Sequence, residues 1–264
     1  MKPVRLISLL VIIIIISVAA KKVLVSDVYN WEKLEIKKNS SGEVRDFFSS
    51  PAHTLENFQI KAITLYPGKD TKDYLVESGT DELLIIKEGT AEISVNKVPR
   101  TLSVGGIGVV FAGDNVAIKN TKDVNAVYYS IKFKPYKSGV QKQAEKVSSP
   151  VFVDWSTPVF VPSEIGGRRD FIKQPTSSLN ELEIHVTTLK EGTSSHSPHS
   201  HPDEEIIVMR YGNAVMDING KPYEAGPGSI YFLAGNDPHG IVNKGAVPCE
   251  YYAIRWLTNV PVKK

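Results

Sequence analysis

The sequence predicts an all-β protein built from two tandem copies of one unit. One half of the chain repeats in the other, and apolar residues occur in short runs rather than at helical spacing. Beyond residue 20, no stretch combines sustained helical periodicity with capping residues. The 19 glycines and 16 prolines suit many short strands joined by turns.

The internal repeat is clearest where residues 42–68 are set against residues 166–192, at an offset of 124 and without a gap. Ten of the 27 paired positions are identical. The match begins upstream, at Trp31 and Trp155, and after one deletion it continues into the last strand expected in each copy. The chain is therefore a tandem duplication, since a fixed period of this kind marks repeated structural units.

The repeat and the composition together predict the domain boundaries. The first domain is expected at residues 21–134 and the second at residues 151–264, which are ordinary sizes for a domain. Residues 135–150 are polar and carry prolines, a glycine and lysines, so they are expected to form a linker. Residues 1–20 form a separate segment, considered below.

Apolar alternation identifies the strands of each unit. Both copies also carry an arginine followed by an aspartate, Arg45–Asp46 and Arg169–Asp170. In each copy the two residues are expected to form a structural ion pair. The expected strands are Phe58–Leu65, Leu83–Ile86, Ala91–Val95, Val127–Phe133, Leu182–Leu189, Ile206–Met209, Ala214–Ile218 and Tyr251–Trp256.

Four residues of the second copy have the chemistry and spacing of a metal site. His199, His201 and Glu205 share one parity, so an extended strand or a tight bend directs all three side chains to one side. His239 follows an Asp-Pro turn signal and can add a fourth ligand from a neighbouring strand. Three imidazoles and a carboxylate suit a divalent first-row metal ion.

The glycines around these residues give the pattern a family resemblance. Six residues separate Gly192 from His199, and six separate Glu205 from Gly212; Gly228 begins the segment that carries His239. This resembles the two cupin motifs, written G-x5-H-x-H-x3/4-E-x6-G and G-x5-P-x-G-x2-H-x3-N. All four ligand positions are filled. The departures are one extra residue after Gly192, and an alanine and an asparagine in the turn before His239.

The resemblance implies two tandem cupin-type double-stranded β-helix, or jelly-roll, barrels, and hence a bicupin. At the ligand positions the first copy aligns Val76, Ser78, Glu82 and Ala117. A single carboxylate does not hold a transition metal with useful affinity, so Glu82 is expected to find a hydrogen-bond partner instead. The sequence therefore predicts one divalent transition metal (Mn, Fe, Zn or Ni), in the second domain.

Further residues are expected near the metal. His196 lies three positions before His199 and is the candidate for an acid–base role, with an exposed loop histidine as the alternative. His185, Tyr231 and Asn236 are candidates for substrate binding; a solvated position, core packing and turn formation are their alternative roles. Glu204 has the opposite parity to Glu205 and is expected to face solvent.

The N-terminal segment resembles an export signal. A basic start, Met1–Arg5, precedes an apolar run, residues 6–20, that ends in Val-Ala-Ala. About 15 apolar residues are short for a membrane span, which needs roughly 20. A cleaved signal and a periplasmic or other extracytoplasmic location are therefore expected. Inner-membrane attachment through residues 6–20 is the alternative. Cys249 is the single cysteine and is expected to be buried.

The composition of the chain narrows the kinds of binding partner to expect. The 31 basic and 29 acidic residues are evenly mixed, with no concentration of positive charge for nucleic acid. The expected partner is a small-molecule substrate, and a homo-oligomer stays open. The expected function is that of a metal-dependent enzyme with dioxygenase, isomerase/lyase or hydrolase chemistry. The alternative is a non-catalytic metal-containing protein that binds a sugar or an organic acid.

Overall fold

The computed structural model describes residues 22–137, 147 and 149–260. The expected export signal, residues 1–20, and most of the expected linker, residues 135–150, lie outside the described residues. Within the described part the chain is β-structure apart from one short 3-10 helix, η1 (Trp31–Lys33). No helix in that part is both long and apolar enough to cross a membrane. The predicted all-β fold class is confirmed.

The first unit pairs a seven-stranded antiparallel sheet with a four-stranded one, and together they form a jelly roll. The large sheet has the order β12-β9-β6-β11-β4-β3-β2 and the small sheet β5-β10-β7-β8. The strands are β2 (Ile36–Lys38), β3 (Gly42–Ser50), β4 (Leu55–Leu65), β5 (Tyr74–Leu75), β6 (Asp81–Glu88), β7 (Thr90–Val95), β8 (Val98–Ser103), β9 (Ile107–Val110), β10 (Asn115–Lys119), β11 (Ala126–Pro135) and β12 (Val151–Val153).

The second unit repeats this plan. Its large sheet has the order β1-β19-β16-β21-β15-β14-β13 and its small sheet β18-β17-β20. The strands are β1 (Asp27–Tyr29), β13 (Val161–Ser163), β14 (Gly166–Gln174), β15 (Glu181–Leu189), β16 (Glu204–Tyr211), β17 (Ala214–Ile218), β18 (Lys221–Ala225), β19 (Ile230–Leu233), β20 (His239–Val242) and β21 (Cys249–Leu257).

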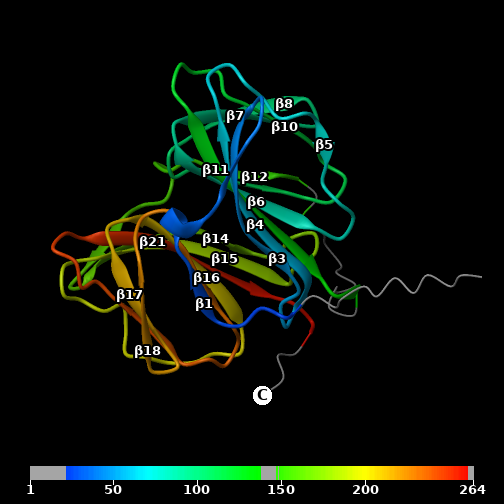
Figure 1. The fold of residues 1–264 in the computed structure, drawn as a ribbon. Coiled ribbons are helices and arrows are strands. Elements are labelled where there is room, and N and C mark those ends of the chain that lie inside the picture. Colours follow the sequence, from blue (N-terminus) through cyan, green and yellow to red (C-terminus); the bar gives the residue numbers. More distant parts are fainter. Residues whose placement is uncertain (1–21, 138–146, 148, 261–264) are drawn as a thin grey trace, which may run out of the picture.

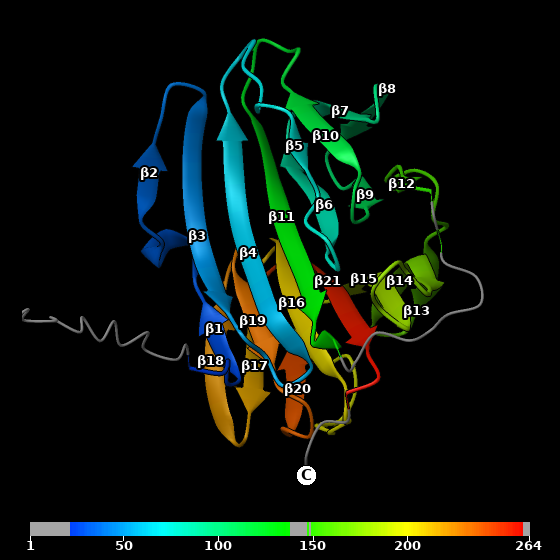
Figure 2. The same ribbon diagram turned by 90° about the vertical axis from the view of Figure 1, so that its right-hand side faces the viewer.

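The two units exchange a strand with one another. β1 lies in the range expected for the first domain but pairs with β19 of the second unit, and β12 lies in the range expected for the second domain but pairs with β9 of the first unit. Figures 1 and 2 show the β1 segment lying among the strands of the second unit. Because both pairings are backbone ladders, each unit's large sheet is completed by chain from the other side of the repeat.

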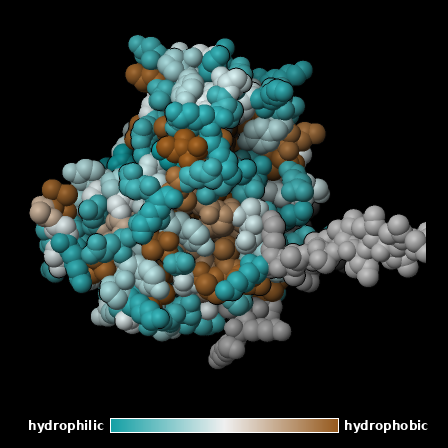
Figure 3. Space-filling model, in the orientation of Figure 1, coloured by the Kyte–Doolittle hydropathy of each residue, from teal (hydrophilic) through white to brown (hydrophobic). Residues whose placement is uncertain are grey.

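Packed aromatic rings join the units where their large sheets face each other. Phe58 and Phe133 come from the first unit, Phe232 and Trp256 from the second, and all four are buried in one cluster. The Phe58 ring centroid lies 4.8 Å from that of Trp256 and 6.1 Å from that of Phe232. Rings of this size dominate the energetics of an apolar interface. The outer face in Figure 3 instead mixes hydrophilic residues with small apolar groups.

The expected pairing of Arg45 with Asp46 does not form. The Arg45 guanidinium stacks 4.4 Å from the ring centroid of Trp31, and Lys87 lies on the same ring at 4.6 Å. Asp46 pairs instead with Lys37 and Lys61. Successive residues of a strand point to opposite faces, so Arg45 and Asp46 cannot meet.

The second unit repeats the cation–ring arrangement. Arg169 and Arg210 lie 5.1 Å and 4.0 Å from the ring centroid of Trp155, while Asp170 pairs with Arg168. The two arginines common to both copies therefore hold a tryptophan at the boundary between the units.

Glu204 does not face solvent, which corrects the sequence expectation. Its carboxylate is fully buried and accepts hydrogen bonds from the backbone N–H groups of His53 and Thr54 and from the Thr54 hydroxyl. The matching first-unit residue, Asp81, accepts bonds from a turn of the second unit, through the hydroxyls of residues 176–178 and the Ser178 N–H. Each unit thus places one buried carboxylate against the other unit's turn.

Candidate metal centre

Two chain segments bring the four expected ligands together at the open end of the second unit. Glu205 lies on β16, and His239 begins β20. His199 and His201 lie in the loop before β16, where the backbones of His199 and His239 exchange two hydrogen bonds of 3.0 and 2.9 Å. A tight bend rather than a strand therefore directs His199 and His201 towards Glu205.

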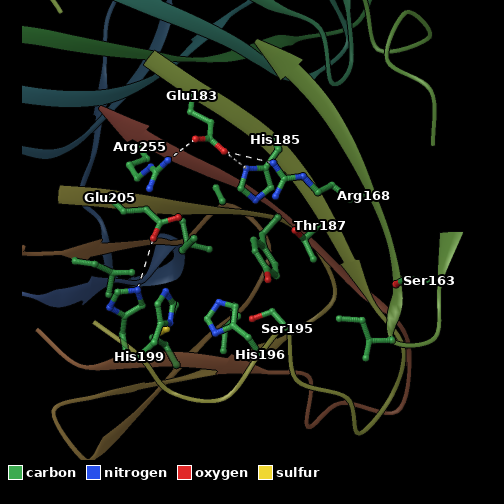
Figure 4. Close-up of a pocket in the computed structure, with 18 of the residues that line it drawn as sticks. Ser163, Arg168, Glu183, His185, Thr187, Ser195, His196, His199, Glu205 and Arg255 are labelled. Carbon is green, nitrogen blue, oxygen red and sulfur yellow. Dashed lines mark hydrogen bonds and ion pairs between the residues drawn. The ribbon is translucent and has the colours of Figure 1, made fainter. Parts of the chain in front are cut away.

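The ligand atoms converge. The metal-binding nitrogens of His199, His201 and His239 all lie within 4.8 Å of one another. An oxygen of Glu205 lies 3.4 Å from His201 Nε2 and 3.7 Å from His239 Nε2. Figure 4 shows the Glu205 carboxylate directed at the imidazole group. This is the donor set that the sequence predicts, gathered around one point.

Backbone carbonyls set the orientation of two imidazoles. His239 Nδ1 donates to the Asp237 carbonyl at 2.8 Å, and His201 Nδ1 donates to the Asp203 carbonyl at 3.0 Å. A proton fixed on Nδ1 leaves the lone pair on Nε2 free for a metal. His239 Nε2 is buried and has no hydrogen-bond partner. An unpaired buried nitrogen is costly, so the residues present fit a bound metal ion.

The electrostatics of the three imidazoles differ. Burial lowers the pKa of His239 and, together with neighbouring imidazoles, the pKa of His199. The hydrogen bond to Glu205 raises the pKa of His201. Glu205 therefore favours the protonated form of His201, whereas burial favours the neutral forms of His199 and His239.

A cavity of about 470 Å³ opens from the ligands. It is walled by β14, β15, β21 and the loop before β16 (Figure 4). Its floor is apolar, with Ile207, Met216, Leu233 and Ile241. The polar residues of its wall are Ser163, Arg168, Glu183, His185, Thr187, Ser195, His196, Tyr251 and Arg255.

Two further histidines line the cavity. His196 is exposed, and its ring packs edge-on against His199 with centroids 4.1 Å apart. His185 is largely buried, and burial together with the Arg168 charge lowers its pKa to about 4. Its Nδ1 lies 3.7 Å from Glu183, too far for a hydrogen bond, and has no partner. Both histidines are placed to contact a ligand in the cavity.

Tyr231 and Asn236 do not line the cavity, which corrects their expected part in substrate binding. Tyr231 is fully buried in the core, and its hydroxyl donates to the carbonyls of Ala214 and Tyr223. Asn236 adopts a φ of 69° in the turn before β20, where its N–H bonds the His201 carbonyl at 2.7 Å. Asn236 therefore shapes the ligand loop through its backbone.

Several wall residues were not among those expected from the sequence. Glu183 and Thr187 share the parity of His185 on β15, so strand alternation could have identified them. Arg255 lies between Glu183 and Glu205 in the register of the sheet. Arg168 on β14 carried no comparable signal, because β14 was not among the expected strands.

The strand register corrects the equivalences between the two copies. His199 pairs with His239 as Tyr74 pairs with Val116 in the first unit. Likewise Asn236 N–H bonds the His201 carbonyl as Gly113 N–H bonds the Val76 carbonyl. The first-unit counterparts are therefore Tyr74, Val76, Glu82 and Val116 rather than Val76, Ser78, Glu82 and Ala117. The offset between the copies is therefore 125 at His199 and His201 and returns to 123 at Glu205 and His239.

The corrected first-unit counterparts of the metal ligands include no histidine. Val76 and Val116 are buried in its hydrophobic core. Glu82 is buried as well; it accepts a hydrogen bond from the Ser130 hydroxyl and lies 3.8 Å from Lys132 Nζ. Burial, and the nearby Glu82 charge, raise the pKa of Tyr74. A hydrogen-bonded carboxylate in an apolar interior thus replaces the ligand group, as expected for Glu82.

Comparisons with known proteins agree with this architecture. Residues 185–255 match the family model described as Cupin domain. A 56-residue stretch is 33% identical to L-ectoine synthase from Vibrio campbellii and covers 21% of this chain and 44% of that protein. The match therefore spans less than half the length of this relative.

Solved structures match over most of the chain. Oxalate decarboxylase from Lactobacillus farciminis, in a formate complex, has a TM-score of 0.70 at 13% identity, over 91% of this chain and 89% of that one. Protein Ylba from E. coli has a TM-score of 0.70 at 14% identity, over 94% and 97%. AerE from Microcystis aeruginosa has a TM-score of 0.65 at 15% identity, over 85% and 97%. At these identities the similarity establishes the fold.

Residues 185–255 thus match a cupin domain, and the chain shares the fold of these solved structures over most of its length. A candidate site of three histidines lies in the second unit.

Proposed function

We propose that the second unit binds one divalent transition metal (Mn, Fe, Zn or Ni) through His199, His201, Glu205 and His239. The observation that carries this proposal is the unpartnered, buried Nε2 of His239, directed at the same point as the other ligand atoms. Four protein ligands leave about two positions on an ion that commonly takes six. A bound metal of this kind would supply Lewis-acid polarisation of a substrate oxygen.

We further propose that the protein is a metal-dependent enzyme acting on a small molecule. The cavity opens directly onto the ligands, and two imidazoles outside the ligand set line it. His196 is positioned to move a proton at the exposed side, and His185 to accept or donate a hydrogen bond at the buried side. These groups favour isomerase or lyase chemistry, with dioxygenase and hydrolase reactions as the alternatives.

The names of the relatives support a catalytic role. The matching curated protein is a synthase and one structural relative is a decarboxylase. A non-catalytic protein that binds a sugar or an organic acid is the competing proposal. It needs the metal and the cavity but not the proton-transferring group at His196.

Metal-substituted protein tests the proposal. The full chain is loaded with Co²⁺, and the visible spectrum is followed while small acids, sugars and phenols are added. A substrate that binds the metal should perturb the spectrum, and His196→Ala should slow its turnover while metal content stays unchanged. A spectrum that no compound alters, in a protein whose metal is closed off by its own side chains, would contradict the proposal.

We also propose that the protein is exported, by a signal at residues 1–20. The support is the sequence of that segment alone: a basic start, a short apolar run and a small-residue end. N-terminal sequencing of protein from its native host should then begin near Lys21. A mature chain that keeps Met1 and needs detergent for extraction would establish inner-membrane anchoring instead.

A further inference from the structure

The charged side chains of the cavity wall cancel one another. Arg168 and Arg255 contribute two positive charges, and Glu183 and Glu205 contribute two negative charges. His185 adds none near neutral pH, since its pKa is lowered to about 4. With a divalent ion in place, the cavity therefore carries two uncompensated positive charges. An anionic ligand neutralises them, whereas a neutral one leaves them in a partly desolvated pocket.

Arg255 is already committed to the protein. Its guanidinium donates to Glu183 at 2.6 Å and to Asp203 at 3.3 Å. It lies between Glu183 and Glu205 in the register of the sheet and bonds the Glu183 carboxylate. This arrangement leaves Arg255 as a positioning residue of the wall rather than a free anion site.

Arg168 also makes two bonds, through Nε to Asp170 at 2.5 Å and through one terminal nitrogen to Glu183 at 3.4 Å. Its side chain is nevertheless 46% exposed, more than that of Arg255, and Asp170 lies on the open surface. Glu183 is more closely paired with Arg255 at 2.6 Å and Lys173 at 3.0 Å. A guanidinium has five N–H donors, so Arg168 can bind a further carboxylate in the bidentate manner.

Arg168 and the ligand group line the same cavity, whose wall also includes the polar residues Thr187, Ser195 and Tyr251. Figure 4 shows Arg168 beside His185 on the wall and His199 at the opposite end. The unpartnered His185 Nδ1 adds a polar contact next to Arg168. A ligand that satisfies both Arg168 and the ligand group carries a polar group at each end.

The first unit has no such group. In the register of the two sheets Arg168 corresponds to Val44 and Glu183 to Gln59. The arginine thus occurs in the copy that has the imidazoles, and an apolar residue takes its place in the copy that lacks them.

We infer, on the basis of the proposed function, that the substrate is a small organic acid whose carboxylate binds Arg168 while a second oxygen group, at its other end, reaches the metal ligands. Arg168 is then the residue that selects acids over neutral compounds of the same length. A metal centre alone accepts neutral oxygen ligands as well, so the selection of acids depends on Arg168.

Calorimetric titration of the metal-loaded full chain tests this inference. The probes are the straight-chain dicarboxylates from malonate to adipate, each compared with the diol of the same chain length. At least one acid should bind more tightly than its diol. Arg168→Gln should weaken that binding about tenfold or more, since a charged hydrogen-bonded pair is lost. Arg168→Lys should restore part of it, and Arg100→Gln, an exposed arginine of the first unit, should leave it unchanged.

The outcomes separate this inference from the proposed function. Equal binding of acid and diol, no binding by any acid, or acid binding unaffected by Arg168→Gln overturns the role of Arg168 while the metal stays in place. Elemental analysis of the same samples reports on the proposed function: a chain without metal overturns both.

Discussion

The two units share their interface and differ in their interiors. Both bury a carboxylate against the other's turn, at Asp81 and Glu204, and both hold a tryptophan between two cations, at Trp31 and Trp155. The cavity ends differ. The second unit gathers three imidazoles around Glu205, while the first surrounds Glu82 with apolar side chains, a tyrosine and a lysine. Features common to both copies therefore support the assembly, and features of one copy carry the chemistry.

One glycine position that both copies share shows how a common residue supports the scaffold. Gly89 and Gly212 have φ of 68° and 64°, and a Cβ would lie 2.3 Å from the Asn125 carbonyl oxygen and 2.4 Å from that of Pro248. Only glycine fits both positions. Identity between the copies at these sites thus reflects backbone geometry rather than function, although the second glycine is also part of the metal-site motif.

The largest effect is expected from the buried carboxylates, because each is held by several donors of the other unit. Glu204→Ala and Asp81→Ala should each lower the free energy of unfolding by about 3–5 kcal/mol, the usual cost of leaving a buried charged network unpaired. Urea denaturation of the metal-free chain measures this. Glu224→Ala, at an exposed position, is the control and should change little. A large cost at one carboxylate and a negligible cost at the other would break the symmetry between the units.

A smaller, pH-dependent effect is expected at His185. Its pKa is about 4 in the folded chain against an ordinary value of 6.5, because burial and Arg168 disfavour the charged imidazole. Between pH 6.5 and 4 the unfolded chain takes up a proton that the folded chain does not. The free energy of unfolding should therefore fall by about 3 kcal/mol more over that pH range in the unaltered chain than in His185→Gln.

Urea denaturation of the metal-free protein at several pH values measures the His185 effect. Lys61→Gln, at the matching position of the first unit, is the control and should keep the pH dependence of the unaltered chain. A pH dependence that survives in His185→Gln would contradict the assignment to this imidazole.

The smallest effect on stability should come from Glu82, and it sharpens the comparison with Glu205. Glu82→Gln keeps the shape but weakens the bond from Ser130 and the attraction to Lys132, so a loss of about 1–2 kcal/mol is expected. Its metal content should equal that of the unaltered chain. Glu205→Gln should instead reduce metal retention on dialysis. Loss of metal in Glu82→Gln would assign a metal to the first unit.

Much of this architecture could be predicted from the sequence. The eight expected strands all lie within observed strands, because alternation of apolar residues reports directly on a half-buried sheet. β3 and β14 were not among them, although the repeat begins at their first residues. Both strands carry a register shift, between Asp46 and Phe48 and between Asp170 and Ile172, that interrupts simple alternation.

The candidate site was predicted in part. The four metal ligands come together because their spacing reflects local geometry: a bend and a turn. Tyr231 was misplaced because it shares a face of β19 with the cavity residue Leu233 but lies in the core, where its hydroxyl bonds backbone carbonyls. Glu204 was misplaced for another reason: its partners are residues 53 and 54, about 150 positions away. The alternation of side chains along a strand shows which of them point away from the cavity. It does not show whether the other unit covers that face of the strand.

Metal analysis tests the central claim, that the two copies share a scaffold and one of them holds the metal. Protein purified gently from metal-replete medium should contain one divalent transition metal per chain. His239→Ala should lower this value towards zero, while Val116→Ala, its matched counterpart in the first unit, should leave it at one. Two metals per chain, or a His239→Ala protein that keeps its full metal content, would contradict the account.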